Sequence, residues 1–402
     1  MSKLEELIEQ YCPDGVEWKA LYSITKQFSG MTGVSNKWAE EGNCVFIDYN
    51  NVYNHTSVDT TALKKATVKS LKQNTLKKGD ILFTSASETP DECALSSVIE
   101  TDVPDGVFLD DHLFGLRLLD EYSSVISPSY LKYAFRSEQF RFQIKKVVRG
   151  ATRHYVSKVD FMKLEIPVPP LPVQEEIVRI LDTFTELQAE LQAELQKRKQ
   201  QYIFYRDNLL NFKNINRRGQ EIKWMKIGEI CNVITGGEVP VDSIKGDTPQ
   251  GDFKYPIWGN GKDIYGYSAT YQITQDAVCI SSIGANTGAV FFHSAYFTPI
   301  IRLKVLIPLS KKVSTKYLFY ILSTVGFDVK KSSVPNMNST EVKQKRIPIP
   351  AFAEQQRIVS ILDRFEALTN DLTSGLPAEI EKRRQQYEFY RDKLLTFKRK
   401  EA

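Results

Sequence analysis

A long internal repeat constrains this chain more than any other feature. The segment 166–184, IPVPPLPVQEEIVRILDTF, returns at 347–365 as IPIPAFAEQQRIVSILDRF, a shift of 347 − 166 = 181 residues. A second segment, QQYIFYRDNLL at 200–210, returns at 385–395 as QQYEFYRDKLL, a shift of 385 − 200 = 185 residues. A repeat of this length determines the architecture before any local signal does. We therefore expect two units, each made of a globular stretch followed by a long helix.

The repeat divides the chain into four segments. Their expected bounds are a first globular domain at 1–165, a central helix at 166–213, a second globular domain at 214–346 and a C-terminal helix at 347–402. A length of 402 residues is too great for one ordinary hydrophobic core, which agrees with this division.

Both globular segments have the sequence pattern of mixed α and β structure. Apolar runs between Gly, Asn and Asp predict strands at 79–84, 113–118, 255–259, 277–281 and 288–292. One helix is expected near the end of each segment, at 128–135 and 314–322. The prediction is an α/β (α+β) fold with two globular domains separated by two long helices. Outside their ends, the two globular segments align poorly with each other.

The first long helix has the pattern of a coiled coil. From Val173 to Phe212 the chain contains no Pro or Gly, and Pro172 followed by acidic residues is typical of a helix start. Seam positions recur three and four apart, with the polar Gln188 and Arg198 at two of them, which is the 3.5-residue period of a coiled-coil seam. The apolar and aromatic residues of the predicted seam are Ile177, Leu181, Phe184, Leu191, Leu195, Tyr202, Tyr205, Leu209 and Phe212.

The second long helix keeps this seam but should be interrupted. Its predicted seam consists of Ile358, Leu362, Phe365, Leu372, Tyr387, Tyr390, Leu394 and Phe397. The sequence SGLP at 374–377 lies between the two parts of the seam, and a proline removes a backbone donor and crowds the preceding turn. We predict a break near 375–377. The first helix carries AELQAELQ at 189–196 in the same region and should be continuous.

The two helices are expected to pair with each other. An intramolecular antiparallel pair costs less entropy than a dimer because both partners belong to one chain. Such a pair would relate the two units by a pseudo-two-fold axis, and the helix length would then act as a ruler between the domains. A homodimeric zipper is an alternative that the sequence leaves open.

Two basic stretches occupy matched places, each shortly before a copy of the I-P-x-P motif. Residues 145–158 contain five Lys and Arg and no acid, and in the second stretch, 330–346, only Glu341 opposes the positive charges. Matched basic runs favour a nucleic-acid surface, although the net charge is only +4. Expected phosphate contacts are Lys145, Lys146, Arg149, Lys158, Lys330, Lys331 and Lys343. Expected base contacts are Arg153, His154, Asn336 and Asn338, since Arg suits guanine and Asn suits adenine.

Signatures of common enzyme classes are missing from the sequence. We find no phosphate-binding loop, dinucleotide fingerprint, zinc-protease helix, nucleophile elbow or methyltransferase signature, which argues against these common enzyme classes. Four His and five Cys show no metal-ligand spacing, so no metal site is expected. Scattered cysteines, an N-terminus without a signal region and the lack of a membrane-spanning run predict a cytoplasmic protein.

The two copies of I-P-x-P…Q…I-V-x-I-L-D-x-F and of Q-Q-Y-x-F-Y-R-D-x-L-L resemble the conserved regions of the specificity subunit of Type I restriction–modification enzymes. Residues 79–83 and 283–290 also resemble the target recognition domains of that family. The resemblance extends over the whole chain in the order head, helix, head, helix.

The resemblance implies a non-catalytic subunit that binds double-stranded DNA. Each head would recognise one half of a bipartite site, and the helices would set the spacer and dock two methyltransferase subunits. No cofactor is expected on this chain, since S-adenosylmethionine and ATP would bind partner subunits, among which restriction and translocase subunits are a further option. The rival hypotheses are a coiled-coil scaffold or homodimer with protein-binding heads, and a dimeric transcription regulator.

Overall fold

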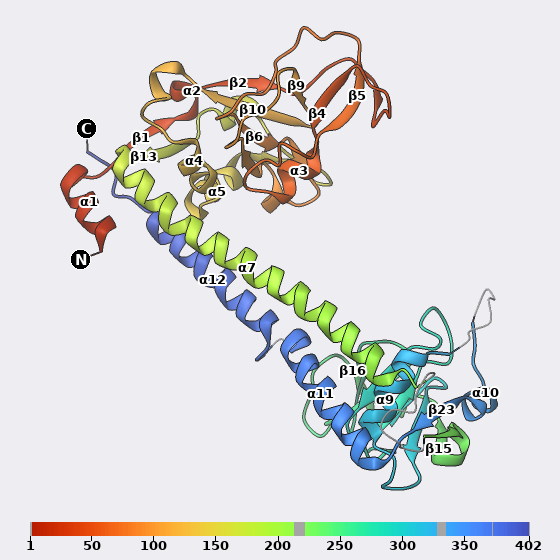
Figure 1. The fold of residues 1–402 in the computed structure, drawn as a ribbon. Helices are drawn as coiled ribbons and strands as arrows, with labels where there is room; N and C mark the ends of the chain where they lie inside the picture. Colours follow the sequence, from red (N-terminus) through yellow and green to blue (C-terminus); the bar gives the residue numbers. More distant parts are fainter. Residues whose placement is uncertain (1, 213–221, 328–334, 372, 402) are drawn as a thin grey trace. The chain divides into compact units, whose positions relative to one another are not determined.

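The structure is a computed structural model that describes residues 2–212, 222–327, 335–371 and 373–401 (Figure 1). It contains two compact units. Unit 1 consists of Met1–Leu191 with Ile380–Ala402, and unit 2 consists of Gln192–Glu379. Each unit therefore combines one globular domain with parts of the long helices. Within the described ranges, no helix is both long and apolar enough to cross a membrane.

The globular part of unit 1 precedes the first long helix, and we call it head 1 (residues 2–170). Its helices are α1 (Lys3–Tyr11), α2 (Leu21–Ile24), α3 (Tyr49–Asn54), α4 (Pro128–Ala134), α5 (Glu138–Val147) and α6 (Lys158–Phe161). A central sheet has the order β2 (Thr25–Ser29), β10 (Leu113–Leu118), β6 (Ile81–Thr84), β8 (Ser96–Val98). An outer sheet has the order β3 (Val34–Lys37), β5 (Lys64–Val68), β4 (Cys44–Ile47), β9 (Val107–Leu109), and β4 runs parallel to β9.

Two smaller sheets complete head 1. The first pairs β1 (Glu17–Ala20) with β13 (Glu165–Val168), which carries the first I-P-x-P motif and leads into the long helix. The second has the order β11 (Val148–Arg149), β12 (His154–Val156), β7 (Ala86–Ser87).

The globular part of unit 2, which we call head 2 (residues 222–350), has counterparts of three of the four sheets of head 1 among its described residues. Its helices are α8 (Ile227–Ile230), α9 (Thr315–Val325) and α10 (Ser339–Gln344). A central sheet has the order β15 (Cys231–Thr235), β22 (Lys304–Pro308), β19 (Ala277–Ile280), β20 (Val290–His293). An outer sheet has the order β16 (Ser243–Lys245), β18 (Gly266–Ser268), β17 (Tyr255–Trp258), β21 (Thr298–Pro299), and β17 runs parallel to β21. The pair β14 (Lys223–Lys226) and β23 (Arg346–Ile349) carries the second I-P-x-P motif.

The two heads thus share one topology, although their sequences align poorly. Trp18 pairs with Pro167 in head 1, and Trp224 pairs with Pro348 in head 2. The short helices α2 and α8 lie directly before β2 and β15, which makes Thr25 equivalent to Cys231. Because both central sheets keep the same register from that point, positions in one head can be assigned to positions in the other. The fold class predicted from the sequence is confirmed.

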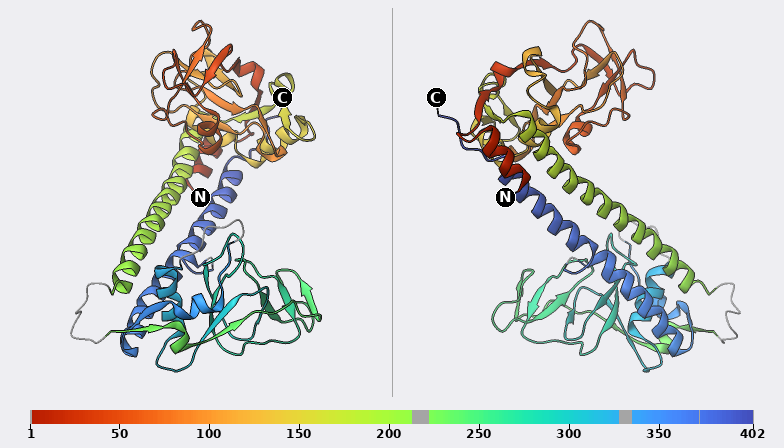
Figure 2. Two further views of the ribbon diagram at one scale, coloured as in Figure 1. Left: turned by 90° about the vertical axis from the view of Figure 1, so that its right-hand side faces the viewer. Right: turned by 60° about the vertical axis from the view of Figure 1, so that its left-hand side comes forward.

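The helices behave as their sequences predict. Helix α7 (Leu171–Leu210) is continuous, whereas the second copy is divided into α11 (Phe352–Asn370) and α12 (Leu376–Leu394). The interruption lies directly before Pro377, which falls in the first turn of α12, where a missing N–H costs little. In unit 1 the first half of α7 lies beside α12, as both views of Figure 2 show.

In each unit the two long helices contact each other within the chain through residues of the predicted seam. The side chains of Ile177, Leu181, Leu195, Ile358 and Leu362 are buried. In unit 1 the Phe184 ring stacks on Tyr390, and in unit 2 the Tyr205 and Tyr202 rings lie against Phe365. Phe184, Leu191, Tyr202, Phe365 and Tyr387 are half-buried, whereas Tyr205 and Tyr390 are exposed. Leu372 lies outside the described residues.

Each head is fixed to its helix by the same hydrogen bonds. Gln174 is fully buried, donates to the carbonyl oxygens of Pro169 and Val125, and accepts from Ser127 N at 2.9 Å. Gln355 does the same with Pro350, Lys312 and Ser314. The repeated glutamine is therefore a structural residue that satisfies the backbone where the head meets the helix.

Candidate nucleic-acid interface

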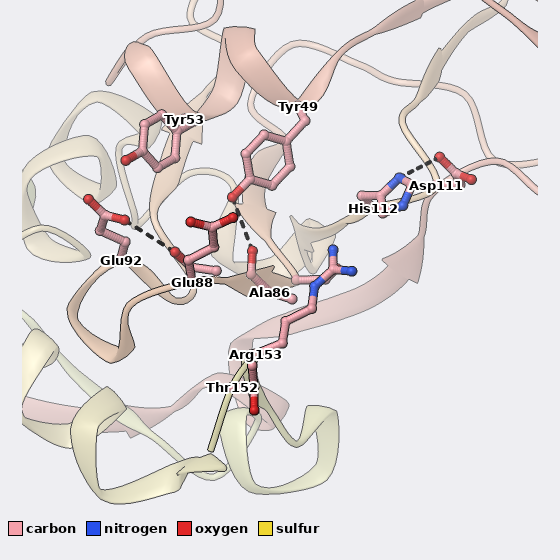
Figure 3. A pocket seen from close by; sticks show the side chains of 11 residues that line it. Tyr49, Tyr53, Ala86, Glu88, Glu92, Asp111, His112, Thr152 and Arg153 are labelled. Atoms are coloured by element: carbon pink, nitrogen blue, oxygen red, sulfur yellow. Dashed lines mark hydrogen bonds and ion pairs between the residues drawn. The ribbon is translucent and has the colours of Figure 1, made fainter. Parts of the chain in front are cut away.

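Head 1 contains an open pocket of about 780 Å³ between α3, β7 and the turn that follows β11 (Figure 3). It is lined by Tyr49, Tyr53, Ser85, Ala86, Ser87, Glu88, Glu92, Asp111, His112, Thr152 and Arg153. Hydroxyl, carboxylate, imidazole and guanidinium groups therefore meet in one concave surface. These groups can form hydrogen bonds with the edges of nucleic-acid bases.

The aromatic side of the pocket is built by helix α3. Asp48 caps this helix by accepting from Asn51 N at 3.2 Å, and the following turn places Tyr49 and Tyr53 on one face. Their rings stack with centroids 5.8 Å apart, and the Tyr49 hydroxyl donates to Ala86 O at 3.0 Å. The pocket wall therefore consists of two fixed aromatic rings.

Arg153 enters the pocket from the turn between β11 and β12, and Figure 3 shows its guanidinium between Glu88 and His112. Gly150 makes this turn feasible. Its φ is +105°, and a Cβ there would lie 2.1 Å from Arg153 O, so a larger residue would displace the turn. Arg153 is exposed on this turn and is available to a ligand.

A charged cluster borders the pocket on the opposite side. The Lys37 ammonium lies 2.9 Å from Asp110 Oδ1, 2.6 Å from Asp111 Oδ1 and 3.1 Å from His112 Nδ1. Desolvation opposes the charge of Lys37, but the hydrogen bonds to Asp111 and Asp110 outweigh it and raise the pKa of the lysine. Asp110, Asp111 and His112 are the one group in the described ranges with metal-like spacing, and the Lys37 ammonium contacts all three.

The structure places the predicted basic residues of head 1 in several environments. Lys145 pairs with Asp91 at 2.7 Å and Arg149 pairs with Asp160 at 2.6 Å, so acids from outside the run partly neutralise it. Lys146 lies over the Phe142 ring at 4.3 Å. His154 is half-buried on β12, and Lys158 donates to Ser29 Oγ at 3.0 Å. The run is therefore not one continuous free basic surface, and its DNA contacts stay predictions.

In head 2, Lys330 and Lys331 lie outside the described residues. Asn336 is exposed and forms an isolated antiparallel β-bridge with Ile283. Asn338 is the N-cap of α10 and accepts from Glu341 N at 2.8 Å, which is the ordinary structural role of an asparagine at that position. Lys343 is exposed. The sequence does not distinguish a capping asparagine from one that contacts bases, and the base contacts of Asn336 and Asn338 stay predictions.

The register identifies which residues of head 2 correspond to the pocket of head 1. Asn260 occupies the position of Tyr49, because it follows β17 as Tyr49 follows β4. Arg302 occupies the position of His112, because it precedes β22 as His112 precedes β10. Asn260 is held by Ser282 N, which donates to its Oδ1 at 2.7 Å. Arg302 is exposed, and both Ile301 and Arg302 have positive φ values, of 50° and 61°. A positive φ is unusual for a β-branched residue such as Ile301.

One basic run was missed by the sequence analysis although it was visible. Between Ala62 and Gly79 head 1 contains no acid and six exposed lysines. They are Lys64, Lys65, Lys69, Lys72, Lys77 and Lys78. Because this run has no counterpart in the second half of the repeat, a search for matched runs did not find it. Tyr49, His112 and Arg302 gave no sequence signal, since they gather only through the sheet register.

Two copies of one mixed α/β domain, each packed with parts of the two long helices, define an internally duplicated protein with two heads. The family model described as "Type I restriction modification DNA specificity domain" matches residues 13–198 and 220–382. The chain belongs to this family and is a type I restriction–modification specificity subunit with two target recognition domains.

Known relatives agree with this assignment. A type I specificity subunit of Mycoplasma pneumoniae is 34% identical over 298 residues, which cover 70% of this chain and 85% of the relative. The specificity subunit of the type I restriction enzyme EcoR124I/EcoR124II of Escherichia coli is 36% identical over 288 residues, which cover 62% of this chain and 67% of the relative.

Solved structures show the same fold at low sequence identity. The S subunit of a type I restriction–modification system from M. genitalium is similar with a TM-score of 0.56 and 16% identity, covering 95% of this chain and 96% of that one. The HsdS subunit from Thermoanaerobacter tengcongensis is similar with a TM-score of 0.51 and 17% identity, covering 95% of both chains.

Proposed function

We propose that each head of this chain recognises one half of a two-part DNA site and that the chain itself carries out no chemistry. The observation that carries this proposal is the use of one topology with different side chains at equivalent places. Tyr49 and His112 of head 1 correspond to Asn260 and Arg302 of head 2. A duplicated scaffold with divergent surface groups suits two recognition surfaces for two different sequences.

Arg153 in head 1 and Arg302 in head 2 are the proposed base contacts. Both guanidinium groups are exposed on turns, and neither forms an ion pair among the described residues. An arginine can donate two hydrogen bonds to guanine in the major groove, and each such pair contributes about 1–3 kcal/mol of discrimination. The lysine run between Ala62 and Gly79 would supply phosphate contacts, which carry affinity without sequence preference.

The helices would hold partner subunits. We propose that two methyltransferase subunits dock on this chain, that they bind S-adenosylmethionine, and that ATP is used by a separate motor subunit where one is present. Five unpaired cysteines, all buried, suit a cytoplasmic location in which thiols stay reduced.

The test is methylome sequencing of a methylation-free host that expresses this chain with its methyltransferase subunit. The expected result is a new N6-methyladenine motif with two defined halves and an unspecified spacer. A soluble complex that produces no motif would instead support the scaffold hypothesis.

Two substitutions assign the halves to the heads. Arg153→Ala should relax one half of the motif and leave the other unchanged, while Arg302→Ala should do the reverse. Val241→Ala is the control, since Val241 is fully exposed in head 2 and lies outside the Arg302 turn. Relaxation of both halves by one variant would contradict the assignment of one head to each half.

A further inference from the structure

Lys304 in head 2 is a buried lysine with an unusual environment. Its side chain lies on β22 and is only 5% exposed, and its ammonium donates to Thr235 Oγ1 at 3.1 Å. The Thr235 hydroxyl in turn lies 3.1 Å from Ser339 Oγ. Burial lowers the pKa of Lys304, and the positive charge of Arg302 lowers it further. The ammonium of Lys304 thus has hydroxyl and cationic neighbours and forms no ion pair within the described chain, an arrangement that favours an added anion.

Head 1 holds an ammonium at the equivalent place. Lys158 donates to Ser29 Oγ at 3.0 Å. Ser29 is the last residue of β2 and pairs with Phe114, while Thr235 is the last residue of β15 and pairs with Lys304. Ser29 and Thr235 are therefore equivalent positions, and both are exposed.

The two lysines themselves come from different positions of the fold. Lys158 is the first residue of α6, and its equivalent in head 2 is Ser339, the first residue of α10. Lys304 lies on β22, and its equivalent in head 1 is Phe114 on β10. In head 1 that position belongs to an aromatic cluster, in which Phe114 lies 5.1 Å from the Phe161 ring.

If the lysine had only a structural role that both heads kept after duplication, it would occupy equivalent positions in the two heads. Instead, Lys158 on α6 and Lys304 on β22 contact hydroxyls at equivalent positions from two different elements. The shared feature is an ammonium next to a hydroxyl at the end of the first strand of the central sheet. A ligand group common to both heads would account for this shared feature.

We propose that each lysine–hydroxyl pair, Lys158 with Ser29 and Lys304 with Thr235, binds one phosphate of the DNA backbone. This inference rests on the proposed function. An ammonium and a hydroxyl are both donors to phosphate oxygens. Lys158 is exposed, whereas Lys304 is buried, and a desolvated ammonium gains more from an anion than a solvated one. In head 2 the exposed Arg302 adds a second cation beside the pair. Because a phosphate is common to every sequence, two heads with different target sequences can share it.

The experiment measures the affinity of the full chain, assembled with its methyltransferase subunits, for a duplex that carries the methylated motif, at several salt concentrations. Loss of one phosphate contact lowers the slope of log K against log salt by about one unit. We expect this change for Lys304→Met and for Lys158→Met, and a change of about two units when both are combined.

A transplant tests the equivalence directly. Adding Ser339→Lys to the Lys304→Met variant gives head 2 the arrangement of head 1, and it should restore the salt slope. The controls are Lys26→Met and Lys312→Met. Lys26 is exposed near the start of β2, whereas Ser29 ends that strand. Lys312 is exposed and follows the end of β22, whereas Lys304, the partner of Thr235, begins that strand. Each control lysine is therefore distant along the strand pair from the hydroxyl in question.

Two results would overturn the inference while leaving the proposed function intact. One is an unchanged salt slope in Lys304→Met and Lys158→Met complexes that still methylate the motif. The other is weaker binding with an unchanged slope and no recovery in the transplant, which would make the lysines structural. Failure of the unsubstituted complex to prefer its motif over other DNA would instead refute the proposed function.

Discussion

Phe184 stacks on Tyr390 with ring centroids 5.4 Å apart and an interplanar angle of 25°. The repeat produces the same contact in unit 2, where Tyr205 and Phe365 stack at 5.4 Å and 28°. The repeat therefore places the same Phe–Tyr contact between the helices in both units. Leucine is the usual residue at such seam positions. Aromatic stacking of this kind contributes about 0.5–1.5 kcal/mol beyond the buried area.

Each stacked tyrosine also supports an exposed phenylalanine. Phe389 is 63% exposed and meets Tyr390 edge to face at 5.3 Å, and Phe204 is 64% exposed and meets Tyr205 at 5.6 Å. Exposed aromatics fixed by their neighbours are typical anchors of protein–protein interfaces. The two phenylalanines are better candidates for partner docking than the seam residues, which are used within the chain.

We predict that Phe204→Asp and Phe389→Asp each remove one methyltransferase subunit from the complex, and that the double variant removes both. A carboxylate in the centre of an apolar contact would remain unpaired and costs several kcal/mol. Native mass spectrometry of the co-expressed proteins gives the stoichiometry. The control is Val241→Asp, at a fully exposed apolar residue away from the helices. A complete complex from the double variant would exclude this surface as the docking site.

The buried glutamines Gln174 and Gln355 should be sensitive to removal of their amides. Gln174→Leu leaves Ser127 N, Val125 O and Pro169 O without partners, and buried polar groups without partners cost about 1–3 kcal/mol each. We expect faster hydrogen exchange at the start of α7 and in α4, and no change in unit 2. Gln355→Leu should have the same effect in unit 2 alone. Gln196→Leu, at an exposed position of α7, is the control and should leave both units protected.

The sequence predicted the parts of this structure that depend on local periodicity. The seam of α7, the break before Pro377 and the strand 113–118 were all visible as patterns of apolar residues and breakers. The shared topology of the heads was not visible, because equivalent positions such as Phe114 and Lys304 have residues of different chemistry.

The candidate site was harder to predict for a physical reason. The sheet register brings Arg153, Tyr49 and His112 to one pocket from three distant segments, and no sequence spacing encodes that meeting. Runs of basic residues in the sequence were a poor guide to the site, since Asp91 and Asp160 partly neutralise the run at 145–158.

The length of α7 should set the distance between the two halves of the DNA site. Deleting residues 193–196 removes one AELQ copy and shortens the helix by about 6 Å at 1.5 Å per residue. One base pair rises by about 3.4 Å, so the preferred spacer should become one or two base pairs shorter with both halves retained. Methylome sequencing of the deletion variant measures the spacer. Replacing 193–196 by four alanines is the control, because it keeps the length and should keep the spacer.

Acid should destabilise head 2 through His293. This residue ends β20, is buried, and stacks on Trp258 with ring centroids 4.1 Å apart. The Phe291 and Phe297 rings lie close to it, and its Nε2 has no hydrogen-bond partner within the described chain. Burial lowers the pKa of His293 from 6.5 to about 4, so the folded state holds the imidazole neutral.

The sign of the effect follows from proton binding. Between pH 6.5 and pH 4 the unfolded chain binds the proton of His293 while the folded chain does not, so the stability of head 2 falls as the pH falls through this window. The loss approaches about 3 kcal/mol near pH 4, since each pKa unit corresponds to about 1.4 kcal/mol. Hydrogen exchange of β19 and β20, corrected for intrinsic rates, measures it. His293→Phe keeps the ring stack and should flatten this pH dependence, whereas His55→Phe in head 1 should leave it in place. Equal acid sensitivity of head 2 with and without His293 would show that another group is responsible.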